Sequence, residues 1–126
     1  MNVLLDTCAL LALARGDLPR QAANALSKSE EAQVSIVSPW EVALKSAGGK
    51  LHLSEPVFQW FAAMTERYSL RPVPLEARIA CAAAELPLIH KDPFDRVLVA
   101  LAQSHSLPIL TSDKNIPKYA GIKTIW

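Results

Sequence analysis

Short runs of apolar and β-branched residues alternate along the chain with longer segments in which apolar side chains recur at helical spacing. The short runs predict buried strands at residues 2–5, 34–37, 108–111 and 122–125. Residues 70–75 predict an edge strand or an extended loop, because Pro72 and Pro74 cannot donate to a sheet ladder. The longer segments predict helices at residues 8–15, 19–28, 38–48, 56–68, 76–85 and 93–105. This alternation indicates an α/β fold in which helices flank a central, mostly parallel sheet.

Two of the predicted helices begin with sequences that carry an acidic residue in the first turn. Ser38 fits the N-cap of the segment Ser-Pro-Trp-Glu, in which Glu41 completes a capping box. The segment Asp-Pro-Phe-Asp repeats the pattern, with Asp92 as the cap and Asp95 three residues later. These three acids therefore have a purely structural interpretation, because acidic groups favour helix N-termini by about 0.3–1 kcal/mol.

The composition places the chain among single-domain globular proteins. Its 126 residues match one domain at about 100–200 residues per domain, and 51% of them are apolar. A net charge of +1 argues against binding of nucleic acid by bulk charge, although a local basic patch is compatible with it. No apolar run approaches a membrane span, and the first residues lack the basic region of a signal peptide, so we expect a cytoplasmic protein. Cys8 and Cys81 lack metal-ligand spacing and predict buried free thiols.

Four carboxylates are predicted to lie at the same edge of the sheet. Asp6 and Asp113 directly follow predicted strands, and Glu41 and Asp95 occupy the third position of helices that follow short turns. In parallel sheets, ligands bind beyond the carboxyl ends of the strands. Carboxylates a few ångströms apart repel one another, and a hard cation such as Mg²⁺ compensates this repulsion. As alternatives, Asp6 could only cap the following helix and Asp113 could be a turn residue.

Several other side chains carry weaker signals. Lys45 lies four residues after Glu41, which predicts a surface ion pair or a phosphate contact near that acid. Arg96 predicts a solvated or ion-paired position on its helix. The histidines share no metal-ligand spacing and predict structural or surface positions for His52, His90 and His105. The aromatic pattern predicts core positions for Trp40 and Trp60.

The four acids and their flanking residues resemble the motifs of the PIN-domain ribonucleases, especially the VapC-type toxins of bacterial toxin–antitoxin pairs. The motifs are Asp6 in Leu-Leu-Asp-Thr, Glu41 in Ser-Pro-Trp-Glu-Val, Asp95 in Asp-Pro-Phe-Asp-Arg-Val and Asp113 in Ile-Leu-Thr-Ser-Asp-Lys. A single motif of this kind is weak, but four in the same order are specific. The resemblance implies one PIN-like nuclease domain over residues 1–126.

The resemblance also implies a function and a set of partners. Asp6, Asp95 and Asp113 would bind Mg²⁺ or Mn²⁺, and Glu41 would complete the catalytic set by holding or polarising the attacking water. Asp92 would have a supporting role only. The substrate would be RNA, a cognate antitoxin would restrain the enzyme, and the chain would form a homodimer through apolar helix faces.

Two other functions fit the same residues. In a binding module, the acids would only cap helices and the domain would hold RNA or a protein partner. Such a module would show no metal affinity and would tolerate Asp→Asn changes. A housekeeping RNA-processing nuclease of the same fold would share the chemistry but lack an antitoxin, and a short reading frame immediately upstream would favour the toxin.

Overall fold

The computed structural model describes residues 1–126 and contains a five-stranded sheet in the order β3-β2-β1-β4-β5. The strands are β1 (Val3–Leu5), β2 (Ala32–Ser35), β3 (Leu70–Val73), β4 (Ile109–Leu110) and β5 (Thr124–Ile125). All four neighbouring pairs are parallel, which confirms the predicted α/β class. The helices are α1 (Thr7–Arg15), α2 (Arg20–Lys28), α3 (Val37–Ala47), α4 (Val57–Arg67), α5 (Ala77–Glu85), α6 (Pro93–His105) and the short 3₁₀-helix η1 (Ile116–Lys118).

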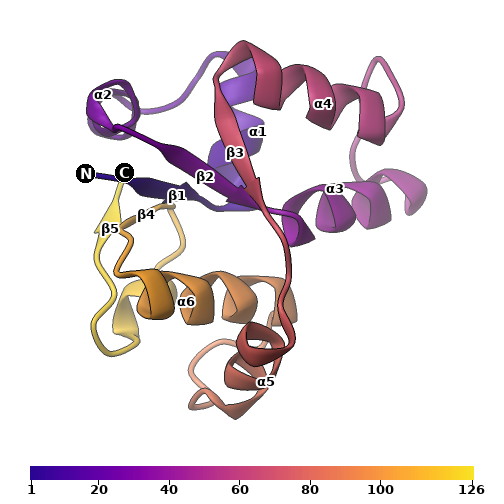
Figure 1. Cartoon of the computed structure of the whole chain (residues 1–126). Coiled ribbons are helices and arrows are strands. Elements are labelled where there is room, and N and C mark those ends of the chain that lie inside the picture. Colours follow the sequence, from indigo (N-terminus) through magenta and orange to yellow (C-terminus); the bar gives the residue numbers. More distant parts are fainter.

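Helices cover both faces of the sheet (Figure 1). Successive residues of a strand point to opposite faces, so β1 contributes to two separate hydrophobic cores. Val3 and Leu5 pack with α1, α2 and α4 on one face. Leu4 packs with α5, α6 and η1 on the other face. Because β1 is buried on both sides, its three residues are all apolar and fully inaccessible.

The order of the strands determines where a ligand site forms. β1 lies at the centre, with β2 on one side and β4 on the other, so the chain reverses its direction of winding between β1 and β4. Crevices outside the carboxyl ends of such strands are the usual ligand sites of open parallel sheets. No helix of the chain is long and apolar enough to cross a membrane.

The region around β2 differs from the sequence prediction. Pairing of Val3 with Ala32 and of Leu5 with Val34 places β2 at Ala32–Ser35, two residues earlier than expected. The Ser35 hydroxyl then accepts a hydrogen bond of 3.2 Å from the Val37 amide, and α3 begins there. Ser38 is therefore not the N-cap of α3. The β-branched residues at 34–37 are typical of a strand, but β2 ends at Ser35 and Val37 begins α3.

The extended segment at Leu70–Val73 confirms the prediction of an edge strand. It forms β3 at one edge of the sheet and pairs with β2 alone. Pro72 has no amide hydrogen, but at this edge it interrupts no hydrogen bonds between central strands. Gly16 ends α1 with a φ of 76°, a left-handed conformation that glycine adopts at little cost.

Arg96 is buried and not solvated, which corrects the sequence prediction. Only 7% of the residue is exposed, and its guanidinium donates to the carbonyl groups of four residues. These acceptors lie at the end of α5 and in the following loop, and they are Ala84, Leu86, Pro87 and His90, at 2.8–3.2 Å. The carbonyl groups at a helix C-terminus attract a cation, and the arginine fork can reach several of them at once. Arg96 thus fixes the loop between α5 and α6.

Two other predictions about exposure are wrong. Cys8 and Cys81 are free, as expected, but both are exposed. Trp60 is buried as predicted, whereas 56% of Trp40 is exposed, with its ring edge-to-face against Phe94 at 5.1 Å between centroids. The helical pattern of α3 does not reveal this, because an apolar stripe looks the same whether it faces a core or solvent.

We expect Arg96→Lys to lower the free energy of unfolding by about 2–4 kcal/mol, because lysine cannot satisfy the separate carbonyl groups that the guanidinium binds. Chemical denaturation measures the change. Arg78→Lys on the exposed side of α5 is the control and should change stability by less than about 0.5 kcal/mol. An equal loss in both variants would contradict the assigned role of Arg96.

Candidate active site

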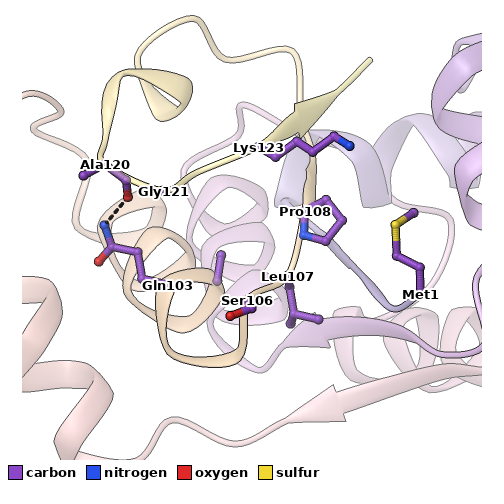
Figure 2. A pocket seen from close by; sticks show the side chains of 9 residues that line it. Met1, Gln103, Ser106, Leu107, Pro108, Ala120, Gly121 and Lys123 are labelled. Atoms are coloured by element: carbon purple, nitrogen blue, oxygen red, sulfur yellow. Dashed lines mark hydrogen bonds between the residues drawn. The ribbon is translucent and has the colours of Figure 1, made fainter.

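Two of the cavities lie at opposite ends of the sheet, and they differ in chemistry. The larger, of about 680 Å³, lies where β1, β4 and β5 begin, beside the end of α6 (Figure 2). Its lining contains one charged side chain, Lys123, and no carboxylate or histidine. The smaller, of about 320 Å³, lies where β1 and β4 end and is lined by five carboxylates and the cations Arg15 and Lys45. Groups able to perform chemistry are therefore concentrated in the smaller cavity.

Asp6 enters the small cavity directly from the end of β1. Its Oδ1 accepts a hydrogen bond of 2.7 Å from the Ala9 amide and so caps α1, while only 3% of the residue is exposed. Burial raises the pKa of Asp6 to about 6, against the effect of hydrogen bonds from Thr111 and Ala9, and the charges of Asp113 and Glu41 raise it further. The cap and the position in the cavity thus belong to the same carboxylate.

Glu41 reaches the cavity from the second turn of α3 and does not form a capping box. Its Oε2 is 2.8 Å from the Lys45 ammonium, which confirms the predicted ion pair and raises the pKa of Lys45 through their hydrogen bond. Glu41 is 6% exposed, and its Oε1 is buried without a hydrogen-bond partner. A buried carboxylate oxygen without a partner is costly, which suggests that a ligand normally satisfies it.

Asp92 and Asp95 stand at the first turn of α6. Asp92 is the N-cap, as predicted, and its Oδ1 accepts from the amides of Phe94 at 2.8 Å and Asp95 at 3.5 Å. Burial raises the pKa of Asp95 to about 7, and the charge of Asp92 adds to this effect. Proximity to His90 acts in the opposite direction.

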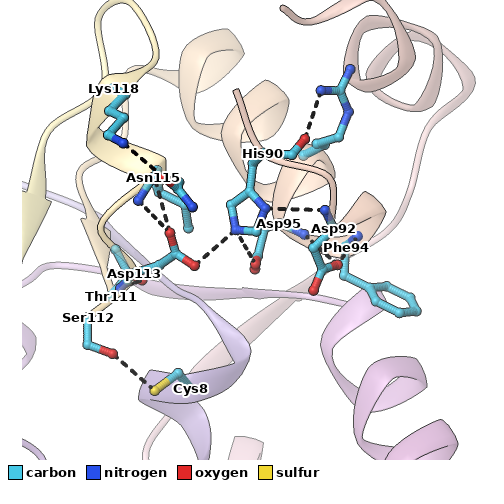
Figure 3. A network of polar contacts seen from close by, with 12 residues as sticks. Cys8, His90, Asp92, Phe94, Asp95, Thr111, Ser112, Asp113, Asn115 and Lys118 are labelled. Atoms are coloured by element: carbon cyan, nitrogen blue, oxygen red, sulfur yellow. Dashed lines mark hydrogen bonds and ion pairs between the residues drawn. The ribbon is translucent and has the colours of Figure 1, made fainter. Parts of the chain in front are cut away.

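His90 is a site residue that the sequence prediction missed. Figure 3 shows its ring between Asp95 and Asp113, with Nε2 at 3.0 Å from Asp95 Oδ2 and 2.9 Å from Asp113 Oδ2. Burial opposes protonation of His90, but the hydrogen bond and charge of Asp113 outweigh it and raise the histidine pKa. Burial also acts to raise the pKa of Asp113, yet the His90 hydrogen bond and two backbone amides lower it overall. The position of His90 just before an Asp-Pro-Phe-Asp helix start was the available signal.

The structure brings all four predicted acids to one cavity. The lining contains Asp6, Glu41, Asp95 and Asp113, with Asp92 beside them. Their roles in metal binding and catalysis stay a prediction. His52 and His105 lie on the surface, as expected. Thr7 and Ser38 lie beside the acids in the sequence. The Thr7 hydroxyl donates a hydrogen bond of 3.1 Å to the Ser38 hydroxyl and so joins the start of α1 to α3.

The donor set of the cavity fits a hard divalent cation. Carboxylate oxygens are the ligands that Mg²⁺ and Mn²⁺ prefer, and the free Oε1 of Glu41 is one such oxygen. Atoms of His90, Asp95 and Asp113 lie within 4.8 Å of one another, so the two carboxylates are close enough to share a single ion. A cation at this position would also stabilise the charged forms of Asp6 and Asp95, whose pKa values are raised by burial and by neighbouring carboxylates.

Comparison with known proteins gives one family over nearly the whole chain. The PIN domain family matches residues 3–122. Ribonuclease VapC22 of Mycobacterium tuberculosis is 27% identical over 112 residues, which cover 86% of this chain and 85% of that protein. A toxin–antitoxin complex from Klebsiella pneumoniae contains a chain with TM-score 0.67 and 21% identity, covering 95% of this chain and 94% of that one. VapBC2 from Rickettsia felis, bound to a promoter DNA fragment, gives TM-score 0.71 at 13% identity, over 98% and 97% of the two chains.

We expect Asp95→Asn to stabilise the metal-free protein at pH 8 by about 1–3 kcal/mol. The folded-state pKa of Asp95, about 7, lies above the ordinary value of 3.8. Between these two values the folded protein retains a proton that the unfolded chain releases, so the wild type loses stability as the pH rises. Asparagine has no charge to repel its neighbours, and its side-chain oxygen can take the place of the Asp95 oxygen that lies 3.0 Å from His90 Nε2.

Thermal unfolding at pH 4 and pH 8 in the presence of a chelator measures this difference. The advantage of the asparagine variant should largely disappear near pH 4, because Asp95 is then protonated in the folded protein and the unfolded chain binds the same proton in nearly half of its molecules. Asp17→Asn is the matched control, because Asp17 is largely exposed and pairs only with Arg15. Equal effects of the two substitutions at pH 8 would show that Asp95 carries no unusual electrostatic cost.

Proposed function

Because the chain belongs to the PIN domain family, we propose that it is a divalent-metal-dependent endoribonuclease that acts as the toxin of a toxin–antitoxin pair. The observation that carries this proposal is the cavity that Glu41 lines together with four further carboxylates, two of which have raised pKa values. The similarity to a protein named ribonuclease VapC22 supports RNA as the substrate.

The carboxylates would divide the work of phosphodiester hydrolysis. Asp6, Asp95 and Asp113 would hold Mg²⁺ or Mn²⁺, and the ion would activate water and stabilise charge on the attacked phosphate. Hydrolysis joins the water oxygen to phosphorus and breaks a phosphorus–oxygen bond, so a base must accept the water proton. Glu41 is suited to this role, because Lys45 occupies its Oε2 and leaves Oε1 as a free acceptor.

The electrostatics of the cavity support a metal-dependent mechanism. A phosphate diester is anionic, and five carboxylates against two cations would repel it from the metal-free cavity. The nitrogen of Lys45 is paired with Glu41, but its side chain is 46% exposed and can also contact a substrate phosphate. Arg15 lines the same cavity and offers a second cationic contact.

A non-catalytic binding module explains these features less well. Helix capping accounts for one oxygen of Asp6 and of Asp92, but it does not require Glu41 or Asp95 to be buried beside other acids. A domain that only bound RNA would gain affinity from basic groups at this position. The arrangement therefore favours catalysis over binding alone.

An antitoxin protein is the proposed regulatory partner. This part of the proposal is supported by the similar fold of a chain in a toxin–antitoxin complex and of a chain in VapBC2. Dependence on an antitoxin would distinguish the toxin from a housekeeping nuclease that performs the same chemistry. We place the protein in the cytoplasm, where RNA and such a partner would be available.

A second copy of the chain is the other proposed partner. Ile36, the N-cap of α3, is followed at intervals of four residues by Trp40 and Leu44 on the helix, and the three side chains are 43%, 56% and 52% exposed. Phe94 extends this α3 stripe through its contact with Trp40. Side chains four residues apart form the ridges by which helices pack, and the same stripe on two copies can pair about a two-fold axis. A homodimer would bury this apolar surface.

We expect Asp6→Asn and Asp95→Asn each to reduce cleavage of total bacterial RNA at least 100-fold and to remove Mn²⁺ binding in calorimetry. Loss of one negative ligand weakens the whole cation site. Asparagine still caps α1 in place of Asp6, so the fold should persist. Glu66→Gln, which changes an exposed acid on α4 outside the cavity, is the control. Equal cleavage by the wild type and Asp6→Asn would contradict the proposal, and absence of Mn²⁺ binding by the wild type would favour the binding module.

For the homodimer, we expect the double change Trp40→Ser and Leu44→Ser to convert a dimer into a monomer. Removal of two large apolar side chains should weaken self-association at least 100-fold. Light scattering coupled to size-exclusion chromatography measures the mass of each form. Phe58→Ser removes a similar side chain, 81% exposed on α4, and should leave the dimer intact. A monomeric wild type, or a dimeric double variant, would rule out pairing through the α3 stripe.

A further inference from the structure

His90 joins two carboxylates that come from different parts of the fold. Asp95 belongs to the first turn of α6, and Asp113 follows β4. One atom, His90 Nε2, lies within 3.0 Å of a carboxylate oxygen of each (Figure 3). The ring is 13% exposed, so protein atoms cover most of it.

The other ring nitrogen determines which way the imidazole donates. The Asp92 amide donates to His90 Nδ1 at 3.2 Å. A backbone amide can only donate, so Nδ1 accepts, and the neutral ring carries its hydrogen on Nε2. The backbone of Asp92 is itself held in place, because its side chain caps α6. His90 therefore donates its one Nε2 hydrogen to Asp113 Oδ2 at 2.9 Å, and Asp95 Oδ2 lies beside the same nitrogen at 3.0 Å.

The main chain of His90 is anchored as firmly as its ring. Its amide donates to the Tyr119 hydroxyl at 2.9 Å, and its carbonyl accepts from Arg96 at 3.2 Å. Tyr119 and Arg96 are 3% and 7% exposed. Tyr119 also donates to the Pro87 carbonyl at 3.1 Å, which ties the same loop to the segment after β4. Such support on both sides is typical of residues that orient functional groups.

The two carboxylates depend on His90 to different degrees. Asp113 Oδ1 accepts from the amides of Asn115 and Ile116 at 2.7 and 3.2 Å, so backbone contacts also position it. The Asp95 carboxylate has no other hydrogen-bond or ion-pair partner, and the charges of Asp92, Glu41 and Asp6 act on it. Without His90, Asp95 would be free to turn away from its neighbours.

We propose that His90 is a positioning residue that holds the Asp95 and Asp113 carboxylates together in the orientation that binds the divalent cation. This inference rests on the proposed function, since it assumes that these acids hold the metal. His90 acts through the carboxylates and not as a metal ligand, because an Nε2 that carries hydrogen has no lone pair to offer. Hydrogen bonds from such outer groups typically change metal affinity 10–100-fold.

The test compares Mn²⁺ affinity, measured by calorimetry, in the wild type and in three variants of the full chain. We expect His90→Ala to weaken binding about 10–100-fold. His90→Gln should remain within a few-fold of the wild type, because the glutamine amide places an N–H donor near the position of Nε2. His105→Ala, an exposed histidine on α6, is the control and should not change affinity.

Electron spin-echo spectroscopy of bound Mn²⁺ adds a readout that a merely structural role would not affect. We expect no strong ¹⁴N coupling from a directly bound imidazole in the wild type. Such coupling, lost in His90→Ala, would overturn the proposal by making His90 a ligand. Unchanged or tighter binding in His90→Ala would also overturn it, as would failure of His90→Gln to restore affinity. If the wild type itself binds no Mn²⁺, the proposed function fails, whereas the other outcomes concern His90 alone.

Discussion

Burial of several carboxylates beside one another at the ends of β1 and β4 is the constraint on which the candidate site depends. Five acids line one cavity, and burial together with neighbouring charge raises the pKa values of Asp6 and Asp95. The surrounding groups offset part of this cost through backbone amides, Lys45 and His90. Stability alone would not select such a cluster, since uncharged residues would pack there at lower cost. Perturbed carboxylates gathered in a cleft are characteristic of functional sites.

Helix capping and a place in the acidic cavity belong to the same residues and do not exclude each other. Asp6 caps α1 with one oxygen, and Asp92 caps α6 while its amide orients His90. Both helices thereby direct their positive N-terminal ends toward the acidic cavity, which partly stabilises its negative charge. From the sequence, capping and catalysis are alternative interpretations of these acids. A carboxylate has two oxygens, so one can cap a helix while the other remains available to a ligand.

The sequence predicted the part of the site that depends on strand order and failed where tertiary contacts decide. Parallel strands end at one edge, so the meeting of Asp6 and Asp113 followed from the position of the predicted strands. His90 could not be found in this way, because its place depends on a loop held by Arg96 and Tyr119. The burial of Arg96 was not predicted for a related reason, because every residue has a carbonyl group and the sequence does not show which of them will accept from a buried side chain. Trp40 shows that periodicity identifies an apolar stripe but not what covers it.

The distance along the chain between the two halves of the cavity has a consequence for protein synthesis. Cys8 and Ser112, whose side chains meet at 3.4 Å beside the acids, are 104 residues apart in sequence. β1 forms its central pairing with β4 only after residues 109–110 have left the ribosome, at about 5–20 residues per second. The acids therefore cannot assemble on a partly translated chain. A nascent chain that has not yet released β4 therefore presents Asp6, Glu41 and Asp95 without Asp113, and its acidic cavity is incomplete.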